Sequence, residues 1–170
     1  VQGWLTGGAV GELKVAVAGA AAVPAEARLS TELGRRTNVV VVLDNSALLG
    51  NAVVQLSKKA IAPLMPGAGV VDSLSIISAG GGSKVEIANS TSEAAVQDAL
   101  SRVRPLGESA TWDGLSAAAD LLENRGSDTN GTVVLFAASA STAQNGGSAT
   151  ALAALRKAGV DLQVVSAASN

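Results

Sequence analysis

The 170-residue chain contains no cysteine and no histidine. Their absence removes thiolate and imidazole nucleophiles, imidazole general bases and the usual protein ligands of zinc, copper, haem and iron–sulfur clusters. The sequence also lacks the Gly-x-Ser-x-Gly and Ser-x-x-Lys motifs of serine hydrolases and the glycine motifs that bind nucleotides. We therefore expect a protein that is not an enzyme.

Aromatic residues are scarce, and so are long runs of basic residues or of apolar residues. The chain has two Trp, one Phe and no Tyr, and its 12 basic residues are balanced by 14 acidic ones without a basic stripe. Nucleic-acid surfaces need such a stripe, often with aromatic residues for stacking. No segment reaches the run of about 18 apolar residues that a transmembrane helix requires. We expect no nucleic-acid partner and no direct membrane insertion by this segment.

Small and aliphatic residues dominate instead, with 48% hydrophobic residues and 19 glycines. Residues 12–19 alternate between apolar and polar or small side chains, which predicts a half-buried strand, and residues 23–29 follow as its hairpin partner. We expect this pair to form a short N-terminal β extension over residues 1–36. The main domain is expected to cover residues 37–170.

From residue 38 onward, short apolar strands alternate with amphipathic helices. The glycine-rich segment "GGGS" at residues 80–83 predicts a tight hairpin turn. The predicted strands cover residues 39–43, 71–79, 84–88, 132–138 and 160–168, and the predicted helices cover residues 53–64, 90–103, 111–126 and 149–158. This order predicts an α/β, Rossmann-like fold with a doubly wound, mostly parallel sheet, helices on both faces and one antiparallel edge hairpin.

Local signals add detail to the helices. Ser90 followed by Glu93 predicts a capping box, and Gly159 predicts a left-handed cap after the last helix. Helical spacing also predicts an inward face for the first helix, with both lysines on the opposite face. The predicted inward residues are Val53, Leu56, Ala60, Ile61 and Leu64, and the lysines are Lys58 and Lys59.

Ligands of doubly wound sheets bind beyond the carboxyl ends of the strands. In this sequence, that rim consists of three segments, residues 44–50, 107–112 and 138–147. The first segment belongs to "NVVVVLDNSALLG", in which an apolar strand leads directly into Asp44-Asn45-Ser46. Strand ends of this kind begin several metal-binding and phosphate-binding sites, so the other two segments decide whether an ion could be held.

The three segments, in this order, resemble the loops of the von Willebrand factor A (vWA) domain family, and the resemblance runs from about Thr37 to the C-terminus. The first loop of the family follows the pattern Asp-x-Ser-x-Ser. Asp44 and Ser46 match this pattern, and Leu48 breaks it. The fold that the resemblance implies is the doubly wound sheet that the alternating pattern predicts.

The other two loops match the family unequally. The second loop of the family ends in a threonine at the start of a helix, which Thr111 matches in "GESATWDGL". The third loop contains an aspartate at the position of Ala138, which is followed by Ser139. In the family these positions form a metal-ion-dependent adhesion site, where hydroxyl and carboxylate oxygens hold Mg²⁺ and an acidic residue of the partner completes the shell.

Two of the five family positions, Leu48 and Ala138, offer no oxygen here. Desolvating a divalent cation costs many kcal/mol, and one matched carboxylate offsets little of that cost. We therefore expect no cofactor; if an ion binds, it is Mg²⁺ or Mn²⁺ held by Asp44, Ser46 and Thr111. Alternatively, these three side chains cap the helices that follow them.

The resemblance implies a non-enzymatic module for protein–protein interaction or adhesion, which the missing donors make metal-independent. The expected partner-binding rim consists of Asp44, Asn45, Ser46, Leu48, Glu108, Thr111, Trp112, Ala138 and Ser139. Trp112 either anchors the partner or packs under the first helix. The alternatives are a weak Mg²⁺- or Mn²⁺-dependent ligand-binding domain and a structural spacer of a pilus or secretion assembly.

The predicted strand pair before Asn38 resembles the short β extension ahead of vWA modules in some envelope-associated bacterial proteins, and the composition, rich in Ala, Gly and Val and poor in Lys, suggests a GC-rich bacterial genome. The sequence begins at Val1 rather than Met. We therefore expect an extracytoplasmic domain that is part of a longer, membrane-associated chain.

Overall fold

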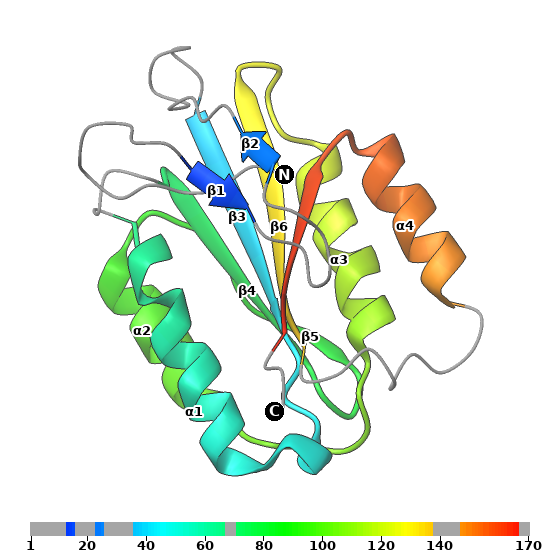
Figure 1. Ribbon diagram of the computed structural model, residues 1–170. Coiled ribbons are helices and arrows are strands. Elements are labelled where there is room, and N and C mark those ends of the chain that lie inside the picture. Colours follow the sequence, from blue (N-terminus) through cyan, green and yellow to red (C-terminus); the bar gives the residue numbers. More distant parts are fainter. Residues whose placement is uncertain (1–12, 16–22, 26–35, 67–70, 138–146, 167–170) are drawn as a thin grey trace.

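The computed structural model describes residues 13–15, 23–25, 36–66, 71–137 and 147–166 (Figure 1). A mixed five-stranded sheet forms its centre, in the order β5-β4-β3-β6-β7. The strands are β3 (Arg36–Leu43), β4 (Ser73–Ala79), β5 (Ser83–Ser90), β6 (Thr129–Ala137) and β7 (Asp161–Ser166). All neighbours pair in parallel except β4 and β5, which form the antiparallel edge hairpin. This confirms the predicted α/β fold.

Helices cover both faces of the sheet (Figure 1). They are α1 (Gly50–Ile61), α2 (Glu93–Arg102), α3 (Thr111–Glu123) and α4 (Gly147–Lys157), with short 3₁₀ turns η2 (Ala47–Leu49) and η3 (Ala62–Leu64) on either side of α1. Helices α1 and α2 pack on one face, and α3 and α4 pack on the other. None of the described helices combines the length and apolar character needed to cross a bilayer.

The predicted N-terminal hairpin is present as two short strands, β1 (Leu13–Val15) and β2 (Val23–Ala25), which pair antiparallel. The rest of the predicted extension lies outside the described residues. The boundary between an extension over residues 1–36 and a domain over residues 37–170 therefore stays a prediction.

Strand β3 forms the centre of both cores because its apolar residues are continuous rather than alternating. Val39, Val41 and Leu43 face the α1 and α2 side, while Val40 and Val42 face the α3 and α4 side. All five side chains are buried. The strand places its carboxyl end, and the loop that begins with Asp44, between the two helical layers.

The inward face predicted for α1 is partly wrong. Val54 and Ile61 are buried, whereas Leu56 is 64% exposed and Ala60 is also exposed. Val54 and Ile61 lie seven residues apart, two helical turns, so they share one face, and Leu56 lies about 200° around the helix from Val54. Lys58 belongs to the inner side after all, because its Nζ donates a hydrogen bond of 2.7 Å to the Val103 carbonyl.

The predicted cap of α2 is also wrong by two residues. The N-cap is Ser92, whose Oγ accepts a hydrogen bond from Ala95 N at 3.4 Å. Ser90 Oγ instead accepts from Ser92 N at 3.2 Å, which fixes the turn ahead of the helix. At the end of α4 the prediction is confirmed, since Gly159 has φ +60°.

Edge strand β5 contains two bulges. Its register against β4 shifts at Glu86, which is the extra residue between the pairs Ile77–Val85 and Ile76–Ile87. A second shift lies near Asn89, which has φ +47° and donates its N–H to Ser75 Oγ at 2.8 Å. Bulges on an edge strand interrupt the flat row of backbone groups to which another chain could pair.

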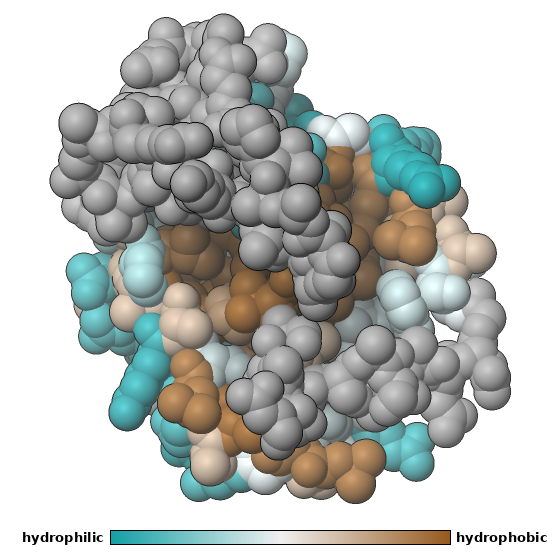
Figure 2. Space-filling model, in the orientation of Figure 1, coloured by the Kyte–Doolittle hydropathy of each residue, from teal (hydrophilic) through white to brown (hydrophobic). Residues whose placement is uncertain are grey.

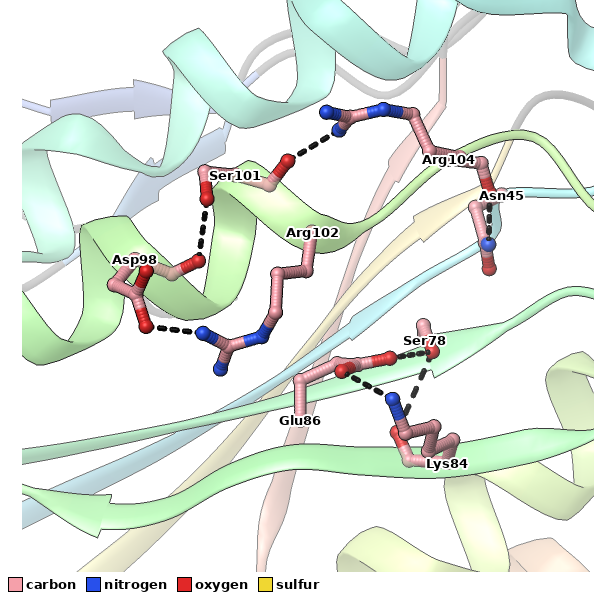
Figure 3. A network of polar contacts seen from close by, with 8 residues as sticks. All are labelled: Asn45, Ser78, Lys84, Glu86, Asp98, Ser101, Arg102 and Arg104. Atoms are coloured by element: carbon pink, nitrogen blue, oxygen red, sulfur yellow. Dashed lines mark hydrogen bonds and ion pairs between the residues drawn. The ribbon is translucent and has the colours of Figure 1, made fainter.

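The bulge residue Glu86 is held by polar contacts within the β4–β5 hairpin (Figure 3). Its side chain is 7% exposed and accepts hydrogen bonds of 2.8 Å from Ser78 Oγ and from Lys84 Nζ. Burial raises the pKa of Glu86, but these two hydrogen bonds and the charges of Lys84 and Arg102 outweigh it, so the pKa lies below its ordinary value of 4.5.

A pH series should detect this network. Because the folded pKa is depressed, Glu86 stabilises the fold above pH 4.5, and the stabilisation is lost as pH falls through the folded pKa. The free energy of unfolding from urea titrations should therefore differ most between wild type and Glu86→Gln at neutral pH, and the difference should shrink in acid. Glu93→Gln, at an exposed position, serves as the control. If the difference in the free energy of unfolding stayed constant with pH, the depressed pKa of Glu86 would be contradicted.

Candidate functional site

Three loops meet beyond the carboxyl ends of β3 and β4. They are the loop after β3, the β4–β5 turn and the α2–α3 connection (Figure 1). Backbone hydrogen bonds join them: Leu106 N to Asn45 O at 2.8 Å, Ala47 N to Gly107 O at 2.8 Å, Gly81 N to Glu108 O at 2.7 Å and Ala110 N to Ala79 O at 3.0 Å. Backbone bonds of this kind fix the loops relative to one another, so the rim is preorganised.

Glycines allow this close approach of backbones. A Cβ on Gly107 would lie 2.5 Å from Gly81 Cα, and a Cβ on Gly80 would lie 2.6 Å from Leu106 O and 2.7 Å from Asn45 O. These are rigid backbone atoms, so a side chain at either position would push the loops apart.

Gly80→Ala should therefore lower the free energy of unfolding by about 2 to 3 kcal/mol, as overpacking against backbone does. Gly126→Ala is the matched control, because neither glycine has a positive φ and the only close contact of a Cβ at Gly126, at 2.7 Å, is with the flexible Asp128 side chain. Chemical denaturation of both variants checks this. Equal losses in the two variants would show that the junction is not tightly packed.

A buried carboxylate lies at the centre of the junction. Asp44 is 2% exposed, its Oδ1 accepts from Ser46 N at 2.9 Å, and its Oδ2 accepts from Ser109 Oγ at 3.1 Å. Ser109 Oγ also shares a hydrogen bond of 2.7 Å with Thr111 Oγ1. The structure thus links Asp44, Ser46 and Thr111 in one cluster, through Ser109 and the Ser46 backbone.

Ser109 was not among the site residues predicted from the sequence. It connects two loops that are 65 positions apart, and only the fold brings these together. The available signal was its place two residues before Thr111, in a segment already assigned to the rim.

Two buried oxygens of the cluster have no hydrogen-bond partner in the described part of the chain, Ser46 Oγ and Asn45 Oδ1. The other end of the Asn45 amide is occupied, since Nδ2 donates to Arg104 O at 2.6 Å (Figure 3). A buried polar atom without a partner costs about 1–3 kcal/mol. The cluster therefore retains one unused carbonyl acceptor, Asn45 Oδ1, and one unused hydroxyl, that of Ser46.

Helix capping does not explain these side chains. The N-cap of α3 is Ala110, and Thr111, the first helical residue, bonds to Ser109 instead. Ser46 is the N-cap of η2, but its side chain makes no capping bond. The capping alternative is wrong for both residues, while Asp44 does accept a backbone N–H in the turn ahead of η2.

Apolar and acidic side chains surround the cluster at the surface. Leu48 is 82% exposed and Leu106 is 62% exposed, and Glu108 and Asp113 are exposed as well. Figure 2 shows apolar surface at the lower end of the molecule, where Figure 1 places η2 and the α2–α3 connection. Leu48 thus presents a methyl-rich side chain to solvent at the position of a family hydroxyl.

Trp112 is half-buried and packs against the core cluster under α3 and α4, and a Cβ on Gly147 would lie 3.1 Å from Trp112 Cβ. It therefore packs, but against the helices of the opposite face rather than under the first helix. Ala138 and Ser139 lie outside the described residues. Their predicted contribution to the rim stays a prediction.

The family model for the von Willebrand factor type A domain matches residues 39–140, more than half of the 170-residue chain. This chain belongs to the vWA domain family. The match includes the strands β3, β4, β5 and β6 and the cluster around Asp44. A comparison with curated proteins gave no match.

Solved structures share the fold at low identity. They include the vWF domain of the type V pili tip protein Mfa5 from Porphyromonas gingivalis (16% identity, TM-score 0.50, 62% of this chain and 38% of that one). An aerotolerance-related membrane protein from Bacteroides fragilis has 16% identity and a TM-score of 0.64, over 75% of this chain and 66% of that one. A von Willebrand factor type A protein from Catenulispora acidiphila has 14% identity and a TM-score of 0.60, over 78% of this chain and 33% of that one. This chain thus spans well under half of the pilus tip structure.

Proposed function

We propose that this vWA domain is a non-enzymatic interaction module of adhesion type, which binds a protein partner at its rim without a metal ion. The observation that supports this most directly is the state of Asp44. Both of its carboxylate oxygens accept hydrogen bonds from the chain itself, from Ser46 N and from Ser109 Oγ. In this role the chain's own donors stabilise the negative charge of the carboxylate that in the family faces a cation.

The donor set fits a divalent ion poorly. Mg²⁺ requires near-octahedral oxygen ligands and gives up its water reluctantly. Ser46 Oγ is free to bind, but Thr111 Oγ1 is engaged with Ser109, and Leu48 replaces a hydroxyl. The described residues contain no group of three or more acidic, His or Cys side chains that could hold a metal. To bind here, an ion would have to break the hydrogen bonds of Asp44 and Thr111, and it would gain only one carboxylate ligand.

The same cluster offers little to catalysis. Ser109 and Thr111 hydroxyls bond to each other and to a carboxylate, and the chain has no imidazole to activate either as a nucleophile. An interaction surface needs no such activation, only fixed shape and chemistry, which the hydrogen-bonded loops supply.

Metal titration tests the proposal. Millimolar Mn²⁺ or Mg²⁺ should produce no calorimetric heat and should shift the Tm by less than about 1 °C, because only a ligand that binds the folded state stabilises it. The double variant Leu48→Ser/Ala138→Asp, which restores both missing oxygen donors, should gain Mn²⁺ binding and a concentration-dependent rise in Tm. Saturable heat from wild type would contradict metal independence.

We further propose that the domain is extracytoplasmic, as part of a longer envelope-associated protein. The similar structures described as a pilus tip protein and a membrane protein support this setting. An antibody raised against the domain should label source cells that are intact or whose outer membrane alone has been permeabilised. Labelling only after the cytoplasmic membrane is permeabilised would place the domain in the cytoplasm.

A further inference from the structure

The rim has an apolar platform of defined geometry. Leu48 and Leu106, 82% and 62% exposed, belong to the two loops that the bonds Ala47 N to Gly107 O and Leu106 N to Asn45 O hold together. Leu106 also packs on the β4–β5 turn, with its Cγ 3.2 Å from a Cβ built at Gly81. Fixed, exposed leucines bury apolar surface in a complex with little loss of loop entropy.

The platform is bordered by negative charge. Glu108 and Asp113 are exposed and form no ion pair within the described part of the chain, and Asp44 lies beneath them. The two described rim segments, residues 44–50 and 107–112, contain two acidic residues, Asp44 and Glu108, and no basic residue.

Cations also lie close to these loops, and hydrogen bonds to backbone carbonyls hold Arg104 and Lys58 in place without removing their charge. Arg104 donates to the Ser101 carbonyl, and Lys84 pairs with Glu86 (Figure 3). Lys58 Nζ donates to the Val103 carbonyl. Below the surface, Asn45 Oδ1 is an acceptor without a partner, and the Ser46 hydroxyl, which can donate as well as accept, also has none in the described part of the chain.

On this basis, and resting on the proposed function, we infer that the rim binds a basic and apolar peptide segment of a protein partner. An apolar side chain packs on Leu48 and Leu106, and flanking lysines or arginines face Glu108 and Asp113. An acidic ligand needs a cation between itself and Asp44; without one it meets like charge, which costs affinity and on-rate. The preference for charge is thus opposite to that of a metal-bearing rim.

Selection from a random peptide library displayed on phage, with EDTA present throughout, tests this inference. The selected peptides should be net basic and should contain at least one large apolar residue. Their affinity, measured by fluorescence polarisation, should fall about tenfold or more in Leu48→Ser/Leu106→Ser and in Glu108→Lys/Asp113→Lys. The matched controls Leu56→Ser and Asp161→Lys, which change an exposed leucine and an exposed aspartate away from the rim, should bind as wild type does.

Three outcomes would overturn the inference. Selection of acidic peptides whose binding requires the rim leucines would reverse the charge assignment, while leaving a metal-free interaction at the rim in place. Peptides that bind all rim variants equally would remove the rim as the interaction surface and the proposed function with it. Failure to select any peptide would show that the platform does not bind a short basic segment.

Discussion

A carboxylate buried at the end of the central strand must be compensated, and in this protein the chain supplies the compensation. Asp44 is almost fully buried, and an uncompensated charge there would cost many kcal/mol. Ser46 N and Ser109 Oγ stabilise the charged carboxylate by donating hydrogen bonds to it. Since Ser109 comes from a distant loop, satisfying one charge also holds the α2–α3 connection against the loop after β3. The rim geometry follows from this requirement.

The edge hairpin contributes to the same junction from the other side. Its turn contains Gly80, whose missing side chain lets the backbones of Asn45 and Leu106 approach, and Gly81 N bonds to Glu108 O. Along the same hairpin, the bulge at Glu86 and the left-handed Asn89 interrupt the edge of the sheet. One element thus serves two purposes: it braces the rim at its turn, and it limits strand pairing along its length.

The sequence predicted the fold far better than the site. Continuous apolar runs such as Val39 to Leu43 identify buried strands, because a strand covered on both faces needs apolar residues throughout. Turns with glycine could also be predicted, because they depend on the local backbone conformation. The errors at Leu56 and Ser90 arose because the phase of a helix and the choice between nearby caps depend on tertiary packing. For Ser109, the sequence indicated only a place in the rim segment; its hydrogen bond to Asp44 could not be predicted, since that contact spans 65 positions.

The departures from the family pattern at Leu48 and Ala138 are physically consistent with the hydrogen bonds that Asp44 accepts within the chain. Losing oxygen donors at Leu48 and Ala138 without other change would leave Asp44 buried beside an empty coordination shell. Here the carboxylate is instead hydrogen-bonded within the chain, and the position of one lost hydroxyl carries an exposed leucine beside a second one, Leu106. In the proposed metal-free state, a rim that carries leucines and retains Asp44 as its one matched family carboxylate is both more apolar and more negative than a metal-bearing rim. Such a surface favours a ligand with apolar and basic groups, because burying leucine gains free energy and pairing the carboxylates limits what desolvating them costs.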